Sequence, residues 1–314
     1  MKVAILTSGG DSCGMNAAIY AVFNKCEELG IKLLGVRHGY KGLLLNDIIT
    51  LDRKEVKENF NKGGSFLKTA RSAEFATAEG VKRAKLVLEN NKIDVLIVIG
   101  GNGSLRGCYD LQKEGVNCLF LPATIDNDLG YTKFSIGFHT AVDNAVDAIN
   151  KIKQTMKTND RGLICETMGR KCYDIGVECA IATRADLLIT KRQPISKIVS
   201  KIQEMVKMGN KSPHIIVQEY LLDIEALAQM CQEATGKEFR STVIGYLQRG
   251  GNPTPQEIIR ATQMGARAVN LIQKEKLNRA VGIINGEVID VSLKTAIITP
   301  NTPEDKLIKL VNHI

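Results

Sequence analysis

Two glycine-rich stretches of this chain follow apolar runs and precede segments of helical periodicity. The first is SGGDSCGM, which begins at Ser8, and the second is GGNGS at Gly100–Ser104. Glycine lets the backbone approach a ligand closely, and the first turn of a following helix offers free N–H groups and a positive dipole end. Such a loop suits phosphate, although each one alone would also serve as a tight strand-to-helix turn. Two together suggest both ends of a phosphoryl transfer.

A third loop, PATIDND, supplies carboxylates for such chemistry. Asp126 and Asp128 stand beside Thr124, directly after the apolar run NCLFLP. In phosphoryl transfer a carboxylate either accepts the proton of the attacking hydroxyl or binds the Mg²⁺ that neutralises phosphate oxygens. An isolated Asp-x-Asp is more often a capped turn, so the neighbouring glycine-rich loops are what favour the catalytic interpretation.

Four charged residues near the ends of other apolar runs extend this set: Arg170, Glu219, Arg240 and Arg249. An arginine fork binds phosphate oxygens in pairs, and a glutamate can order sugar hydroxyls. Taken singly, each arginine would be an ordinary surface or ion-pair residue. Their shared placement at strand ends favours a binding role.

A framework of strands must bring these loops to one edge of a sheet. Short apolar runs alternate with stretches of helical periodicity, the clearest of which predicts a helix over 139–157. The runs that predict strands are 3–7, 32–37, 94–100, 117–122, 162–167, 186–190, 214–220, 242–247 and 280–285. Continuously apolar strands separated by helices indicate parallel sheets covered on both faces, which predicts a doubly wound α/β architecture.

The composition restricts the possible partners. The chain has 314 residues, 44% hydrophobic and 24% charged, which is typical of a globular protein. It carries 42 Lys and Arg against 34 Asp and Glu, but it has no tryptophan and no block of like charge. We therefore expect phosphorylated small molecules and no nucleic acid. We also expect a cytoplasmic protein without a membrane partner, whose eight cysteines are buried, reduced thiols and not a structural metal site.

In their order and spacing, the motifs resemble the bacterial ATP-dependent 6-phosphofructokinases over nearly the whole chain. The matching stretches are TSGGDSCGMNAAI, NKGGSFLKTAR, VIGGNGS, PATIDND, FSIGFHTA, ETMGR, VIGYLQRGG and MGARAV. The resemblance implies two Rossmann-like domains with largely parallel sheets: a larger nucleotide-binding domain over 1–138 and 248–300, and a smaller sugar-phosphate-binding domain over 139–247 and 301–314. It implies the glycolytic transfer of the ATP γ-phosphoryl to the 1-hydroxyl of fructose 6-phosphate.

The resemblance also assigns roles to individual residues. The catalytic set would be Gly10, Arg71, Thr124, Asp126, Asp128 and Arg170, with Asp126 as the general base. The ATP site would comprise Gly10, Arg71, Gly101, Asn102, Gly103 and Ser104, with Mg²⁺ bound by Asn102 and Asp128. The sugar-phosphate site would comprise Thr124, Asp126, Arg161, Met168, Gly169, Arg170, Glu219, Arg240, Tyr246 and Arg249. Arg161 and Arg240 would reach in from a neighbouring subunit of a homotetramer.

Several positions depart from the pattern of that family. Asn102 replaces an aspartate in the donor loop, so it keeps one carbonyl oxygen but loses a charge, and Mg²⁺–ATP affinity or turnover should fall. Arg106 replaces a residue that is usually apolar near the adenine, and Tyr246 replaces a histidine. By contrast, Gly103 and Ala123 match the ATP-dependent family: where its pyrophosphate-dependent relatives carry an aspartate and a lysine, these two residues are small and uncharged, which favours ATP over pyrophosphate as the donor.

A second group of residues resembles the family's effector site for ADP or phosphoenolpyruvate. The matching or conservatively changed residues are Arg53, Lys153, Asp186 and Lys211. Tyr20 and Asn24 stand where that site usually carries arginine, so we expect blunted or altered allosteric control.

Two other functions stay open on the sequence alone. One is a catalytically weakened paralogue that binds sugar phosphate or nucleotide as a regulatory subunit. The other is a pyrophosphate-dependent enzyme. The acceptor could also be a related sugar phosphate such as tagatose 6-phosphate.

Overall fold

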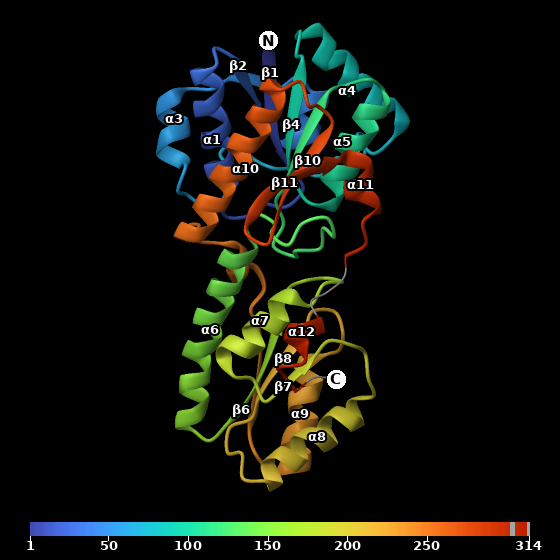
Figure 1. The fold of residues 1–314 in the computed structure, drawn as a ribbon. Coiled ribbons are helices and arrows are strands. Elements are labelled where there is room, and N and C mark those ends of the chain that lie inside the picture. The colour runs from blue at the N-terminus through green and yellow to red at the C-terminus, as the bar shows by residue number, and fades with distance from the viewer. Residues whose placement is uncertain (302–304, 313–314) are drawn as a thin grey trace. The chain divides into compact units, whose positions relative to one another are not determined.

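The computed structural model describes residues 1–301 and 305–312, and it contains two compact units, each with its own sheet (Figure 1). The first unit comprises Met1–Thr140 and Gly250–Thr302, and the second comprises Ala141–Arg249 and Pro303–Ile314. Within the described residues, the chain passes between the units inside α6 (Phe138–Thr158) and again after Arg249. Across the described ranges, we find no helix with the length and apolar character that a membrane crossing requires.

The described part of the first unit holds a seven-stranded sheet in the order β11-β10-β5-β4-β1-β2-β3. The strands are β1 (Lys2–Ser8), β2 (Lys32–Val36), β3 (Ile48–Thr50), β4 (Val95–Gly100), β5 (Cys118–Pro122), β10 (Arg279–Ile284) and β11 (Glu287–Ser292). The inner strands are parallel, and β3 and β11 pair antiparallel at the two edges. Ser8 at the end of β1 pairs with Gly100 at the end of β4, so the two glycine-rich loops begin side by side.

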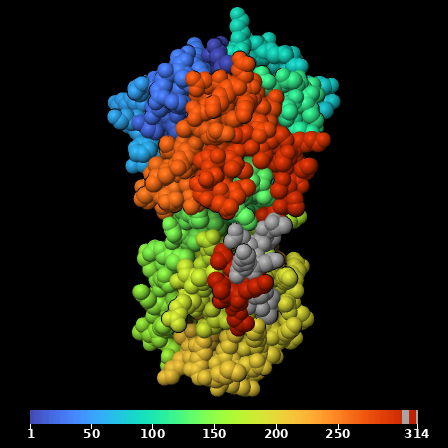
Figure 2. All heavy atoms as spheres, in the orientation of Figure 1, coloured from blue at the N-terminus to red at the C-terminus, as the bar shows by residue number. Residues whose placement is uncertain are grey.

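Helices cover both faces of this sheet. They are α1 (Met15–Glu28), α2 (Gly39–Leu44), α3 (Arg53–Asn59), α4 (Ala78–Asn90), α5 (Asn102–Lys113), α10 (Pro255–Gln273) and α11 (Leu293–Ile298). Successive side chains of β1 alternate: Val3 and Ile5 pack with α1, α3 and α10, whereas Ala4 and Leu6 pack with α2, α4, α5 and α11. The orange and red atoms of the segment from α10 to α11 cover one side of this unit (Figure 2).

The described part of the second unit holds a four-stranded parallel sheet in the order β7-β8-β6-β9. Its strands are β6 (Gly162–Thr167), β7 (Leu187–Ile189), β8 (His214–Gln218) and β9 (Phe239–Val243). Its helices are most of α6, α7 (Asp174–Thr183), α8 (Ile195–Lys207), α9 (Ile224–Thr235), the 3₁₀ turn η1 (Gly245–Arg249) and α12 (Asp305–Ile308). Apolar residues of α8 and α9 form one core with the sheet, and the parallel α/β architecture predicted from the sequence is confirmed.

One predicted strand is wrong. The run 242–247 reads as a strand, but β9 lies earlier, at Phe239–Val243, and Gly245–Arg249 forms η1. Gly245 has a positive φ of 53°, which ends the extended backbone. Tyr246 is 81% exposed, so the apolar residues of this segment do not form a continuously buried run. Arg240 consequently lies inside β9 and not at a strand end.

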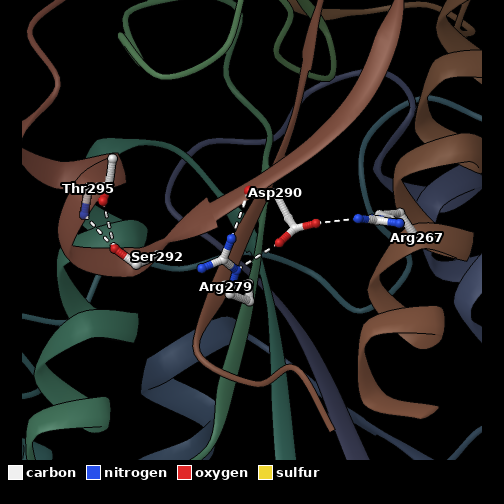
Figure 3. A network of polar contacts seen from close by, with 5 residues as sticks. All are labelled: Arg267, Arg279, Asp290, Ser292 and Thr295. Carbon is white, nitrogen blue, oxygen red and sulfur yellow. Dashed lines mark hydrogen bonds and ion pairs between the residues drawn. The ribbon is translucent and has the colours of Figure 1, made fainter. Parts of the chain in front are cut away.

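A buried carboxylate joins α10 to the strand pair at the sheet edge (Figure 3). Asp290 on β11 has a side chain that is only 9% exposed, and it pairs with Arg267 on α10 and with Arg279 on β10, whose Nε lies 2.7 Å from Oδ2. Burial raises the pKa of Asp290, but the hydrogen bonds from the two arginines outweigh it and leave the pKa below its ordinary value. Beyond this pair, Ser292 caps α11 by accepting the N–H of Thr295 at 3.0 Å.

Candidate active site

The two glycine-rich loops meet at the carboxyl edge of the first sheet. The Ser104 hydroxyl donates to the carbonyl of Ser8 at 3.1 Å, and a Cβ on Gly9 would lie 3.5 Å from the same hydroxyl. The helices that follow, α1 and α5, begin after Gly14 and Gly101, and at neither start does a described side chain cap the helix or an acidic residue occupy the first turn. Their first-turn N–H groups are therefore suited to an anion.

Packing beneath α5 sets the position of its first turn. The buried Tyr40 hydroxyl donates to the carbonyl of Ser104 at 2.8 Å, and the Tyr40 ring stacks on Phe75 with centroids 3.8 Å apart. Gly107 permits this stack, because a Cβ there would lie 2.6 Å from the Phe75 ring. Phe75 thereby anchors the segment that follows Arg71.

Arg71 is exposed in the loop between α3 and α4, and this loop is tied to the end of β1. The Thr7 hydroxyl donates to the carbonyl of Lys68 at 2.9 Å and bonds to the Ser65 hydroxyl at 2.8 Å. These two contacts hold the segment before Arg71 close to the point where the first glycine-rich loop begins.

The acidic loop follows β5, which neighbours β4 in the sheet. Asp126 is buried, and its N–H donates to the Thr124 hydroxyl at 3.2 Å. Ser135 closes the loop from below, because its hydroxyl donates to the carbonyl of Thr124 at 2.8 Å and bonds to Asn127 Oδ1 at 3.1 Å. The loop thus holds the Asp126 carboxyl group in a sheltered position at the same sheet edge as the glycine-rich loops.

Asn102 connects the donor loop to the acidic loop. Its Nδ2 donates to the backbone carbonyl of Asp128 at 3.2 Å, which leaves Oδ1 as an acceptor. Among the described residues, no three His, Cys, Asp or Glu side chains group as metal ligands. Mg²⁺ commonly takes only one or two protein oxygens and completes its shell with phosphate and water. The Asn102 amide oxygen and the Asp128 carboxylate are oxygen donors of the kind that Mg²⁺ takes from a protein.

In the second unit, a tight turn after β6 presents Met168, Gly169 and Arg170. Gly169 has φ 142° and Arg170 has φ 51°, so both lie in the left-handed region. Glu219 stabilises the turn, since its Oε1 accepts the N–H of Gly169 at 3.0 Å and of Arg170 at 2.7 Å. The buried Glu219 carboxylate therefore shapes the turn in addition to any contact with a ligand.

Two arginines of the predicted sugar-phosphate site share one carboxylate. Arg161 Nε lies 2.6 Å from Glu238 Oε2, and Arg240 pairs with the other oxygen of Glu238. Tyr246 is exposed in η1, and Arg249 is half-buried at its end. The second unit thus brings Arg161 and Arg240 together at the edge strand β9.

The chain is similar to known proteins over its whole length. The sequence model described as phosphofructokinase matches residues 2–272. The chain is 39% identical over 315 residues to ATP-dependent 6-phosphofructokinase 1 of Clostridium perfringens, covering 100% of this chain and 99% of that protein. It is 41% identical over 315 residues to ATP-dependent 6-phosphofructokinase of Clostridium tetani, with the same coverage of both chains. This chain belongs to the phosphofructokinase family.

Solved phosphofructokinase structures share the fold. The structure of phosphofructokinase from Saccharomyces cerevisiae superposes with a TM-score of 0.86 at 29% identity, over 94% of this chain and 45% of that chain. This chain therefore spans less than half of the yeast chain. A pyrophosphate-dependent phosphofructokinase from Nitrosospira multiformis has a TM-score of 0.86 at 19% identity, over 97% of this chain and 86% of that one, which shows likeness of fold.

The residues predicted for the phosphofructokinase effector site fall in both units. Lys153 donates to the carbonyls of Thr183 and Arg184 at the end of α7, and burial lowers its pKa. Asp186 accepts the N–H of His214 at 2.7 Å. Lys211 is exposed in the second unit.

The other effector candidates lie in the first unit. Arg53 pairs with Glu27. Tyr20 packs against Phe60, with ring centroids 5.3 Å apart, and Asn24 is half-buried on α1. The uncharged Tyr20 and Asn24 side chains offer an anion no positive charge, unlike the arginines that the resemblance to the family leads us to expect at these two positions.

Sequence reasoning missed buried polar residues that hold the predicted site residues in place. The Gln248 side chain accepts the N–H of Met168 at 3.3 Å and donates to the carbonyl of Gly245 at 3.2 Å. Gln218 donates to the carbonyls of Arg170 and Cys172. Nothing in the local sequence marks either glutamine. Glu257 was also missed, although TPQE at 254–257 has the spacing of a capping box and could have drawn attention to it.

Proposed function

We propose that this chain is an ATP-dependent 6-phosphofructokinase that converts fructose 6-phosphate and ATP to fructose 1,6-bisphosphate and ADP. One observation carries the proposal: two helix starts that no described side chain caps follow neighbouring strands, beside the loop of the buried Asp126. Relatives at 39% and 41% identity over the whole chain bear this name.

The nucleotide is assigned to the first unit. The first-turn N–H groups of α1 and α5 bind phosphate oxygens, and Arg71 compensates the charge of the transferring phosphoryl. Gly10 and Gly101 let the backbone come close to the phosphates. Among the described atoms, a Cβ on Gly103 would meet nothing within 4 Å, so this position leaves room for an α-phosphate. That room supports ATP over pyrophosphate as the donor.

Asp126 is assigned as the general base. As the O1 oxygen of the sugar forms its bond to the γ-phosphorus, the bond from that phosphorus to the bridging oxygen of ADP breaks, and the O1 proton passes to the Asp126 carboxylate. Thr124 fixes the loop through the Asp126 N–H. Mg²⁺, held by Asn102 and Asp128 together with the nucleotide, neutralises phosphate charge when bound.

The sugar phosphate is assigned to the second unit. Arg170 and Arg249 bind phosphate oxygens, the backbone of Met168 and Gly169 lines the turn, and Glu219 holds that turn in shape. Tyr246, an exposed residue, offers a hydrogen bond from its hydroxyl to the 6-phosphate.

We assign Arg161 and Arg240 to the active site of a neighbouring subunit in a homotetramer. The Arg240 side chain is 59% exposed on an edge strand, and Glu238 holds both guanidinium groups together. In an equimolar mixture of Arg240→Ala and Asp126→Asn chains, refolded together, hybrid sites should regain activity that neither variant has alone. Activity that fails to return, in an assembly shown to be mixed, would contradict the shared site.

We also propose that ADP or phosphoenolpyruvate acts only weakly on this enzyme. Arg53, Lys153 and Lys211 supply positive charge, whereas Tyr20 and Asn24 supply none. A response to phosphoenolpyruvate that is abolished by Lys211→Ala would place the effector at these residues, and a strong response would show that the two lost arginines are not needed.

A Mg²⁺-dependent assay with fructose 6-phosphate tests the function directly, with ATP and pyrophosphate compared as donors. Wild type should turn over with ATP, and Asp126→Asn should reduce kcat by about 10²–10⁴ while nucleotide still binds, because it removes the base alone. Asp143→Asn, at an exposed acid on α6, is the matched control and should keep its activity. Turnover with pyrophosphate alone, or binding without any turnover, would instead support the pyrophosphate-dependent enzyme or the regulatory subunit.

A further inference from the structure

Glu257 is a buried carboxylate that the proposed reaction does not use. It stands in the first turn of α10, and its exposed fraction is 0%. Its Oε1 accepts the N–H of Gly137 at 2.8 Å, and its Oε2 accepts the N–H and the hydroxyl of Thr140 at 3.1 and 3.0 Å. One carboxylate from α10 therefore receives three hydrogen bonds from the segment in which α6 begins.

The local sequence offers this carboxylate a nearer partner. In a capping box, the glutamate reaches back to the N–H of its own N-cap residue. Here the Thr254 hydroxyl does accept the N–H of Glu257 at 3.2 Å, but the Thr254 N–H donates to the Thr140 hydroxyl at 3.3 Å. Thr140 therefore links the Thr254 N–H to the Glu257 carboxylate. Glu257 bonds across from α10 to the start of α6 and not to its own N-cap residue.

Glu257 also lies directly beneath the first glycine-rich loop. A Cβ on Gly14 would lie 3.0 Å from the Glu257 Cγ and 2.9 Å from the Ile136 Cγ2. The Ser12 hydroxyl donates to the carbonyl of Ile136 at 2.9 Å, and a Cβ on Gly137 would lie 2.3 Å from the Ser12 Cβ. The loop at 9–14 therefore rests on residues 136–137, which Glu257 holds in place.

The charges around Glu257 compensate it only in part. Burial raises the pKa of Glu257 to about 6, and the charge of Arg260 on the same helix opposes this increase only weakly. The Arg260 guanidinium also contacts His139 Nε2 at 2.7 Å and lies 4.7 Å from the Phe134 ring centroid. In the loop above, burial and the charges of Glu257 and Asp11 raise the pKa of Cys13 to about 11, so this thiol stays neutral. Among the described residues, the three hydrogen bonds from Gly137 and Thr140 therefore compensate much of the cost of burying this carboxylate, which ties its charge to the segment at 136–140.

We propose that Glu257 is a positioning residue that fixes the first glycine-rich loop against the start of α6 and thereby sets the affinity for ATP. The proposal rests on the proposed function for its kinetic test but not for its structural one. The carboxylate touches no substrate in this scheme, and it acts through residues 136–140 and the loop at 9–14.

Glu257→Gln tests the proposal because it keeps the shape of the side chain and replaces one acceptor by a donor that faces N–H groups. We expect the KM for ATP to rise about tenfold, with the KM for fructose 6-phosphate changed less than about twofold. Amide hydrogen exchange should become faster in 9–14 and 136–140. Thr140→Val removes only the linking hydroxyl and should change both readouts in the same direction by a smaller factor.

Asp290→Asn is the matched control, because it also neutralises a carboxylate of the first unit that is mostly shielded from solvent, but one that binds Arg267 and Arg279. It should leave the KM for ATP and the exchange of 9–14 unchanged. If folded Glu257→Gln and Thr140→Val both behave like Asp290→Asn, the positioning role is wrong. If wild type shows no turnover, the proposed function fails, and the exchange measurements still decide whether Glu257 holds the loop.

Discussion

Replacing Glu257 by glutamine should change how the stability of this protein depends on pH. Burial raises the pKa of Glu257 from 4.5 to about 6, although its bonds from Gly137 and Thr140 and the charge of Arg260 oppose the increase. The folded chain then binds more protons than the unfolded chain between pH 4.5 and about 6, so this group makes the free energy of unfolding fall as the pH rises through that window. A pKa difference of about 1.5 corresponds to about 2 kcal/mol above the window.

Glutamine resembles the protonated side chain at every pH. The free energy of unfolding of Glu257→Gln, relative to wild type, should therefore increase by about 2 kcal/mol from pH 4.5 to above pH 6. Urea unfolding followed by far-UV circular dichroism at several pH values measures this difference. Tryptophan fluorescence is not an option, because the chain has no tryptophan.

Other titrating groups near Glu257 are present in both proteins. Burial and the charge of Arg260 lower the pKa of His139 from 6.5 to about 4. Protonation of His139 therefore makes the free energy of unfolding fall as the pH decreases through that range, which is opposite in sign to the effect of Glu257. The pKa of Cys13, about 11, lies outside the range. Subtracting the two curves removes the contribution of His139. A difference that stays constant with pH, or that shifts in favour of wild type as the pH rises, would refute the reasoning from burial.

Three further predictions concern single positions of the first unit. Gly14→Ala should lower the free energy of unfolding by about 1–3 kcal/mol, because the φ of Gly14 is 100° and the new Cβ would lie 3.0 Å from the Glu257 Cγ. Gly103→Ala has open space around the new Cβ, so this variant should fold normally and raise the KM for ATP. Equal stability of the two variants in urea would contradict this prediction. Asn102→Asp should lower the Mg²⁺ concentration that gives half the maximal rate severalfold, because it adds a negative charge, even though the hydrogen bond to the Asp128 carbonyl is lost. An unchanged Mg²⁺ titration would show that residue 102 does not face the metal. Asp290→Asn should reduce stability by about 2 kcal/mol, since it leaves Arg267 and Arg279 poorly paired, and this loss should shrink at a pH low enough to protonate Asp290 in wild type.

Local patterns were sufficient to predict much of the fold. The apolar runs predicted most strands, because a parallel strand covered on both faces needs apolar residues at successive positions. They failed at 242–247, where Gly245 turns the backbone and the apolar side chains that follow are exposed. An apolar run in the sequence does not reveal whether its side chains pack against another element of the fold.

The candidate site divides in the same way. Glycines before a helix and acids after a strand are local signals, so the two glycine-rich loops and the loop of Asp126 could be found from the sequence, and family resemblance extended that set. The contact from Asn102 to Asp128 could not be predicted from the sequence, because it joins segments that follow two neighbouring strands.

The sequence by itself determined the parallel architecture and the chemical character of the loops, since both depend on residues adjacent along the chain. Only the tertiary structure decided which partners the buried polar side chains take. Glu257 shows the reason: its local motif offers a cap three residues away, but its carboxylate bonds to Gly137 and Thr140, which lie 120 and 117 positions earlier. Such a choice depends on which segments the packing of the whole unit brings together.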